Sequence, residues 1–252
     1  IHRFVLAEFT QFGTNVIGVH PGKTKTGGHP PSGLPSSARP LSLDDARSLE
    51  RLPHVIAVTP IVRGNAEVEG NGRTRRTLVS GVNANLPRVF RSTVQSGQFL
   101  PADDAGSARA FAVLGSKLRD ELFGSENPLG QRLRIGGLHF RVIGVMAPKG
   151  QFLGIDLDDT AFIPAARAQE LFNREGVDEV NIAAAEGVPS ALVGAAIKER
   201  MLARHGREDF TIITQEEMLK TLSNILDVLT MAVGALGGIS LLVGGVGIVT
   251  IM

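Results

Sequence analysis

The end of the chain constrains its fold more than any other segment. Residues Val228–Met252 carry no charge and consist mainly of Leu, Ile, Val, Ala and Gly. A helix needs about 20 apolar residues to cross the hydrocarbon core of a bilayer, and this run is longer. A buried core helix is the alternative, but each Gly costs a water-soluble helix about 1 kcal/mol relative to Ala, whereas membrane helices carry Gly more often. The run therefore predicts a transmembrane helix over 228–252.

The residues before this run extend the predicted helix out of the membrane. Thr214 is followed three residues later by Glu217, which is the spacing of a capping box. Apolar residues then recur on one helical face, at Met218, Leu222, Ile225 and Leu229. Because no proline interrupts the segment, we expect one helix of about 57 Å, nearly twice the hydrocarbon thickness. Its first part would be a stalk that carries a soluble domain on the membrane span.

Composition excludes several classes of function. With 26 Lys+Arg against 25 Asp+Glu and a net charge of +1, the chain lacks the excess basic charge of a nucleic-acid-binding domain, so no nucleic-acid partner is expected. It contains no Cys, which removes disulfides, thiol nucleophiles and zinc–thiolate sites together. The chain begins at Ile1 and stops inside an apolar run, so we expect it to be a piece of a longer polypeptide.

Two segments far apart in the sequence share a predicted order of strand, helix and strand. The first comprises a strand at 15–20, a helix from Ser42 to about Leu52, and strands at 55–62 and 65–68 around a break at Gly64. The second comprises a strand at 179–184, a helix opened by Pro189 that runs to about His205, and a strand at 210–213. We expect both to share one sheet, in an α/β lobe built from 1–70 and 176–227.

The ends of the first segment carry further expectations. Apolar residues at helical spacing predict a short helix over 1–12 that packs beside the stalk, and Gly, Pro and Ser predict a flexible loop over 21–40.

The middle of the chain is predicted to be mostly β. Strands are expected at 77–82, 110–114, 131–135, 138–145 and 161–163, with one short helix at 116–123. The pair Gly136-Gly137 between two apolar runs is a strong hairpin signal. Residues 71–175 therefore form a predicted second, β-rich lobe inserted into the first. The fold class expected for the whole chain is α+β, with two lobes followed by a transmembrane helix.

Several motifs fall short of a functional site. Gly22-Lys23-Thr24 lacks P-loop spacing, because Gly18 lies one residue too close and a Gly/Pro-rich loop follows where a helix N-terminus is needed. Asp156, Asp158 and Asp159 lack the Gly and the distal Glu of a calcium loop, so a solvated turn is favoured.

The remaining candidates for site chemistry are equally weak. The histidines form no helical metal-binding pair, and each is expected on the surface: His2, His20, His29, His54, His139 and His205. No motif marks an activated serine. We therefore predict no catalytic residue, no cofactor and no metal site.

Small residues recur four apart within the apolar run, at Gly234 and Gly238 and again at Ser240 and Gly244. This pattern lets two membrane helices approach closely. We therefore expect these four positions to pack against another transmembrane helix.

Several of the segments above resemble, in order, the MacB-like periplasmic core domain of ABC transporter permeases. They are Phe12–Gly22 (FGTNVIGVHPG), Leu52–Pro60 (LPHVIAVTP), Gly97-Gln98-Phe99, Val113–Phe123 (VLGSKLRDELF), Pro128-Leu129-Gly130, Phe140–Val145 (FRVIGV) and Phe162-Ile163-Pro164. Residues 239–252 (ISLLVGGVGIVTIM) are similar to the second transmembrane helix of the FtsX-like permease unit. The likeness covers nearly the whole chain, and the motifs are specific jointly.

The resemblance implies a discontinuous porter-like lobe with an inserted sabre-like lobe, lying between two transmembrane helices on the periplasmic side of the bacterial inner membrane. It implies a homodimeric or paired permease driven by an ABC ATPase, fused or separate, because this chain carries no ATPase motif. A periplasmic adaptor, an outer-membrane exit duct and membrane lipid are the further partners implied.

The resemblance also implies a function. The expected role is to transmit ATP-driven motion across the membrane and expel or transfer a substrate on the far side. An extracytoplasmic sensor or peptide-binding module is the alternative, and a membrane-tethered hydrolase is a weaker one.

Overall fold

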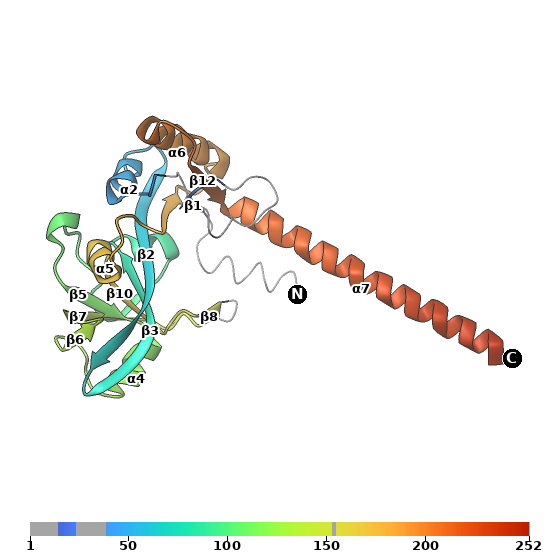
Figure 1. The fold of residues 1–252 in the computed structure, drawn as a ribbon, viewed down its shortest axis with the longest axis horizontal. Helices are drawn as coiled ribbons and strands as arrows, with labels where there is room; N and C mark the ends of the chain where they lie inside the picture. Colours follow the sequence, from blue (N-terminus) through green and yellow to red (C-terminus); the bar gives the residue numbers. More distant parts are fainter. Residues whose placement is uncertain (1–14, 24–38, 153–154, 252) are drawn as a thin grey trace.

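The computed structural model describes residues 15–23, 39–152 and 155–251, which form an α/β body with one long helix projecting from it (Figure 1). Its strands are β1 (Val16–Pro21), β2 (Val55–Gly70), β3 (Arg73–Val82), β4 (Val94–Gly97), β5 (Phe111–Leu114), β6 (Arg132–Ile135), β7 (Leu138–Met146), β8 (Gln151–Phe152), β9 (Ile155–Asp156), β10 (Thr160–Pro164), β11 (Glu179–Ala184) and β12 (Phe210–Thr214). Its helices are α2 (Leu43–Leu49), α3 (Leu86–Phe90), the 3-10 helix η1 (Ala105–Ser107), α4 (Ser116–Phe123), α5 (Ala165–Phe172), α6 (Ser190–His205) and α7 (Gln215–Ile251). The predicted helix over 1–12 and most of the predicted loop over 21–40 lie outside the described residues.

A 10-stranded sheet runs through the whole body, in the order β12-β1-β11-β2-β3-β10-β5-β7-β4, with β6 paired to β2 and β7. β1 lies antiparallel between β11 and β12, and β11 lies antiparallel to β2. The first and last segments of the chain therefore share one sheet, as the sequence predicted. The proposed division into two lobes places its first boundary at the end of β2.

The predicted break at Gly64 is wrong, because β2 is one continuous strand of 16 residues. Gly64 pairs with Val79 of β3 inside the ladder. A Cβ atom at this position would lie 2.4 Å from the ring of Phe172, which ends α5. The glycine thus makes room for an aromatic ring and does not interrupt the strand. Along β2 the neighbouring strand changes from β11 at Ile61 to β3 at Val62.

Local signals set several element boundaries. Ser42 and Asp45 form a capping box at the start of α2, where Ala46 and Leu49 are buried as expected, although the helix ends at Leu49 and not at Leu52. The β6–β7 hairpin turns at Gly136 and Gly137 with φ of 54° and 91°, which suits a primed turn. Helices α3 and α5 and the short strands β4, β8 and β9 are absent from the expectations.

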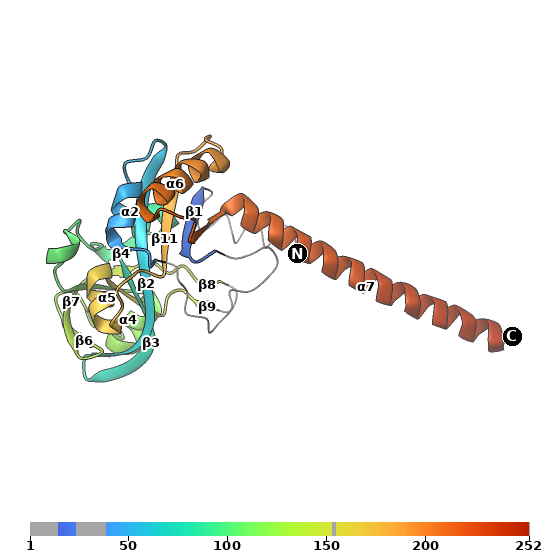
Figure 2. The same cartoon turned by 45° about the horizontal axis from the view of Figure 1, so that its top comes forward.

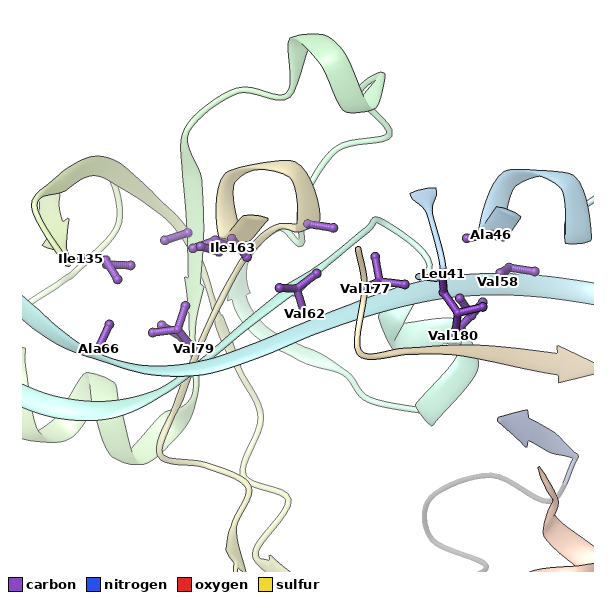
Figure 3. Close-up of a cluster of buried hydrophobic side chains, with 14 of the residues drawn as sticks. Leu41, Ala46, Val58, Val62, Ala66, Val79, Ile135, Ile163, Val177 and Val180 are labelled. Carbon is purple, nitrogen blue, oxygen red and sulfur yellow. The ribbon is translucent and has the colours of Figure 1, made fainter. Parts of the chain in front are cut away.

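The main core follows β2 along its length. Strand alternation sends one set of side chains toward the helices, where they form a single buried cluster with residues of α2, α4, α5 and α6. Figure 3 shows part of this cluster lying along β2, with Leu41, Ala46 and Val58 at one end and Ala66 and Ile135 at the other. The body thus has a continuous apolar layer under its helices, of which α2 and α6 lie side by side (Figure 2).

The opposite face of the sheet carries a smaller core. Its buried residues come from β2, β3, α3, β5, β7 and the segment after β4, and they are Ile61, Val82, Leu86, Leu100, Val113 and Met146. Among the described helices, α3 contributes to this cluster through Leu86 and Phe90. Part of this face is consequently left uncovered by helices.

Candidate functional site

The long helix α7 is the most prominent candidate for a functional element. It is a single helix of 37 residues, which is about 55 Å at about 1.5 Å per residue, and it leaves the body as one straight rod (Figure 1). Its segment Ser223–Thr250 has a mean hydropathy of 2.1 and is 0% buried. Large apolar side chains point outward along it, and Leu241 is 79% exposed. By length and composition this helix can cross a bilayer, which agrees with the predicted span.

The helix begins where an edge strand of the sheet ends. Thr214 is the last residue of β12, and Gln215 is the first residue of α7. The N–H of Glu217 donates to Oγ1 of Thr214 at 3.2 Å, and the N–H of Thr214 donates to Oε2 of Glu217 at 3.4 Å. Both arms of the predicted capping box are therefore present, and no loop separates the sheet from the helix.

The strand that leads into α7 is fixed to the sheet at both of its ends. β12 pairs with β1 from Ile17–Thr214 to Pro21–Phe210. Beyond this ladder, the N–H of Gly22 donates to the carbonyl of Asp209 at 2.8 Å, and Oγ1 of Thr211 donates to the carbonyl of Gly22 at 2.6 Å. Movement of α7 would therefore act directly on the central sheet.

The predicted packing face of the stalk is only partly described. Ile225 and Leu229 are 52% and 55% exposed, while the side chains of Met218 and Leu222 lie outside the described residues. The predicted packing of a second helix against this face of the stalk therefore stays a prediction.

The small residues of the span are likewise open. Apart from the neighbouring backbone of α7 itself, no described atom lies within 4 Å of a Cβ built at Gly234, Gly238 or Gly244, and Ser240 is exposed. Their packing against another membrane helix stays a prediction.

One polar cluster contradicts the expectation that every histidine lies on the surface. The His205 side chain is 2% exposed and lies between two carboxylates, with Nδ1 2.8 Å from Asp209 Oδ1 and Nε2 2.9 Å from Asp45 Oδ2. Nε of Arg204 donates to Asp45 Oδ1 at 2.7 Å, and the N–H of Arg39 donates to Asp209 Oδ2 at 2.9 Å. The cluster joins α2 to the end of α6 and to the residue before β12.

The electrostatics of this cluster favour charged carboxylates. Burial raises the pKa of Asp45, but hydrogen bonding with Arg204 and His205 lowers it more, so the pKa lies below its ordinary value. Burial raises the pKa of Asp209, and hydrogen bonding with the Arg39 backbone and with His205 again outweighs this effect, so this pKa is lowered too. The i, i+4 spacing of His205 and Asp209 is a local signal from which their contact could have been predicted. The contact of His205 with Asp45 spans 160 positions, so no local signal indicates it.

The weaker motifs have structural roles. Nζ of Lys23 lies 2.8 Å from Glu208 Oε2 in an ion pair, and Thr24 lies outside the described residues. Asp158 and Asp159 sit in a turn, as predicted, whereas Asp156 is the last residue of β9, and all three are partly buried. Asp158 accepts from the backbone N–H groups of Lys149 and Gly150, and Asp159 accepts from Arg75 and Thr77. Within the ranges that the structure describes, no group of three His, Asp or Glu side chains is placed to hold a metal ion.

The chain is similar to a known domain family and to two named export proteins. Residues 1–200 match the family described as the MacB-like periplasmic core domain. The chain is 34% identical over 254 residues to the "Pyoverdine export ATP-binding/permease protein PvdT" of Pseudomonas entomophila, covering 99% of this chain and 38% of that protein. It is 31% identical over 250 residues to the "Macrolide export ATP-binding/permease protein MacB" of Marinobacter nauticus, covering 98% and 38%. The chain thus spans about 38% of the length of these relatives.

Solved structures share the fold. The periplasmic region of MacB from Actinobacillus actinomycetemcomitans superposes with a TM-score of 0.72 at 20% identity, covering 88% of this chain and 98% of that chain. The extracellular domain of the noncanonic ABC-type transporter YknZ from Gram-positive bacteria gives a TM-score of 0.63 at 18% identity, covering 79% and 100%. At such identities the likeness establishes the mixed α+β fold, as predicted.

Proposed function

This chain belongs to the family of MacB-like periplasmic core domains, as its sequence motifs predicted, and we infer from its junction with α7 that it couples ATP-driven motion to export. It is a membrane-protein segment with an extracytoplasmic domain and a candidate membrane span. The proposed role is that of a permease part, in which α7 carries movement from the membrane to the sheet. The substrate would be expelled or transferred on the extracytoplasmic side.

The observation that supports this role is the direct passage from β12 into α7. A flexible linker would let the helix move without moving the sheet, whereas a capped helix that begins at the end of a paired strand transmits rotation and tilt. The continuous core under the helices supports the same role, because packed cores resist gradual deformation.

The names of the relatives, which join an ATP-binding function to a permease, support an ATPase partner. We propose that an ABC ATPase domain, fused or separate, hydrolyses ATP for this chain, and that the chain itself is a non-catalytic part of the permease. We further propose a second permease copy, which would pack against Gly234, Gly238, Ser240 and Gly244, and residence in the inner membrane. A periplasmic adaptor and an exit duct complete the proposed assembly.

The proposed role is tested in cells that lack their own exporters and express the complete permease with its ATPase. Pyoverdine and a macrolide are the first substrates to try, because the names of the relatives state export of these compounds. We expect reduced cellular retention of at least one of them, lost when the ATPase is inactivated. Retention that is unchanged by ATPase inactivation for both compounds would contradict export and favour the sensor alternative.

A further inference from the structure

A cavity of about 420 Å³ opens on the face of the sheet that α2 and α6 do not cover. Strand alternation builds it: where Ile17 and Val19 of β1 enter the main core, the intervening Gly18 and His20 face the cavity. The same holds for Glu179 and Asn181 of β11. Strands β2, β3, β10 and β12 complete the floor, and α3 forms one wall.

The cavity is mainly apolar. Its wall includes residues of the smaller core and their neighbours, namely Ile61, Val82, Leu86, Phe90, Met146 and Phe162. Ile213, which immediately precedes the last residue of β12, belongs to the same wall. Small-molecule sites in proteins are concave, largely apolar and about 300–1,000 Å³ in volume, with a few polar groups. This cavity fits that description in size and chemistry.

The charged side chains that line the cavity are equal in number for the two signs. Glu179 forms ion pairs with Arg63 and with His20, the latter when the ring is protonated. Asp158 accepts backbone N–H groups, and Nζ of Lys149 donates to the carbonyl of Phe90 at the end of α3 and to Ser92. Formally, Arg63 and Lys149 balance Glu179 and Asp158, so the site has no excess charge that would select an ion.

Asn181 carries a buried polar atom of the cavity lining that has no partner in the described part of the chain. It is 7% exposed, and its Nδ2 is buried without a hydrogen-bond partner among the described residues. Leaving a buried amide donor unpaired is unfavourable. Its strand partner is Gly18, where an added Cβ atom would lie 3.5 Å from Asn181 Oδ1 and 3.1 Å from His20 Nε2. The donor is covered, so an acceptor atom supplied from the cavity would satisfy it after the side-chain amide turns toward the cavity, a rotation that is broad for Asn.

We propose that this cavity binds a neutral amphipathic small molecule. Its apolar body packs on the aliphatic and aromatic wall, and its carbonyl, ether or hydroxyl oxygen accepts a hydrogen bond from Asn181. The inference does not depend on the export role, since it follows from the cavity alone. Because Ile213 lies next to the sheet–helix junction, a bound molecule would sit close to the start of α7.

Methionine methyl groups provide a local readout of binding. We would incorporate ¹³C-methyl methionine into the full chain in lipid nanodiscs and titrate camphor, a neutral bicyclic ketone. Met146 lines the cavity, Met201 of α6 is buried in the main core, and Met231 lies in the span. We expect a saturable shift at Met146 and none at Met201. A missing shift at Met146, or one that rises without saturation in parallel with Met231, would overturn the proposal.

Two variants separate a ligand contact from a structural role. Asn181→Leu keeps a similar volume and removes the unpaired amide, so camphor affinity should fall about tenfold, the worth of roughly one hydrogen bond, while thermal stability is unchanged or higher. Ser190→Ala is the matched control, because Oγ of Ser190 is also buried and unpaired but lies outside the cavity. It should leave camphor affinity unchanged.

The same experiment distinguishes other occupants of the cavity. Camphorsulfonate, which adds a negative charge to the same skeleton, should bind at least tenfold more weakly than camphor, and stronger binding would overturn the assignment of a neutral ligand. If Asn181→Leu bound camphor with wild-type affinity, the proposed hydrogen bond from Asn181 to the ligand would be overturned. A Met146 shift that depends on protein concentration without any probe would identify a second copy of the chain as the occupant.

Discussion

Replacing Ile225 by proline is expected to abolish export while ATP hydrolysis continues. Proline removes a backbone hydrogen bond and its ring clashes with the preceding turn, which kinks a helix at a cost of about 3 kcal/mol or more. Ile225 is 52% exposed and lies three turns beyond the cap at Thr214, so the kink falls between the sheet and most of the span. The body should still fold, because its core does not include this residue.

The matched control is Ile225→Ala, which removes the same side chain and keeps the helix. The quantity to measure is export per ATP hydrolysed in the complete permease. We expect the alanine variant to keep most of the wild-type ratio and the proline variant to lose it. Coupling that survives proline at this position would mean that α7 is only a tether.

Replacing Asp45 by alanine is expected to destabilise the body by about 3–5 kcal/mol, which is typical when one partner of a buried ionic cluster is removed. The Asp45 side chain is 5% exposed and contacts Arg204 and His205. It also accepts the N–H of Ser42 in the capping box of α2. Asp44→Ala is the control in the same turn, because Asp44 is exposed. Urea unfolding of the two variants in nanodiscs measures the difference.

The pH dependence of this effect follows from the lowered pKa of Asp45. A carboxyl group whose pKa is lower in the folded state adds stability above its unfolded value of about 3.9, and this stability is lost as the pH falls through the folded pKa. The stability gap between wild type and Asp45→Ala should therefore be full near neutral pH and shrink below about pH 4. A gap of equal size at pH 7 and pH 3 would show that packing, and not charge, accounts for the loss.

The parts of the fold that local signals encode were predictable from the sequence. The start of α7 follows from the Thr214–Glu217 spacing, and its length follows from an uninterrupted run without proline. The β6–β7 hairpin follows from its two glycines. Each of these signals lies within the element that it specifies, so no tertiary contact is needed to read it.

The parts that depend on distant contacts were not predictable. The continuity of β2 through Gly64 depends on Phe172, which packs over it from α5. The burial of His205 depends on Asp45, and the cavity depends on the order of strands in the sheet. The candidate site divides in the same way. Helix α7 was predicted from local signals, whereas the surface that packs on its exposed apolar side chains cannot be identified from the described residues.

The rigid connection between sheet and helix is the central claim, and a distance measurement tests it most directly. The chain has no native Cys, so spin labels attach only at introduced cysteines, for which Glu199→Cys on α6 and Val233→Cys on α7 are suitable exposed sites. In nanodiscs, electron–electron double resonance should give one narrow distance distribution, which Ile225→Pro broadens or shifts. A broad or two-peaked distribution in the chain without proline would contradict the claim that α7 and the sheet move as one body.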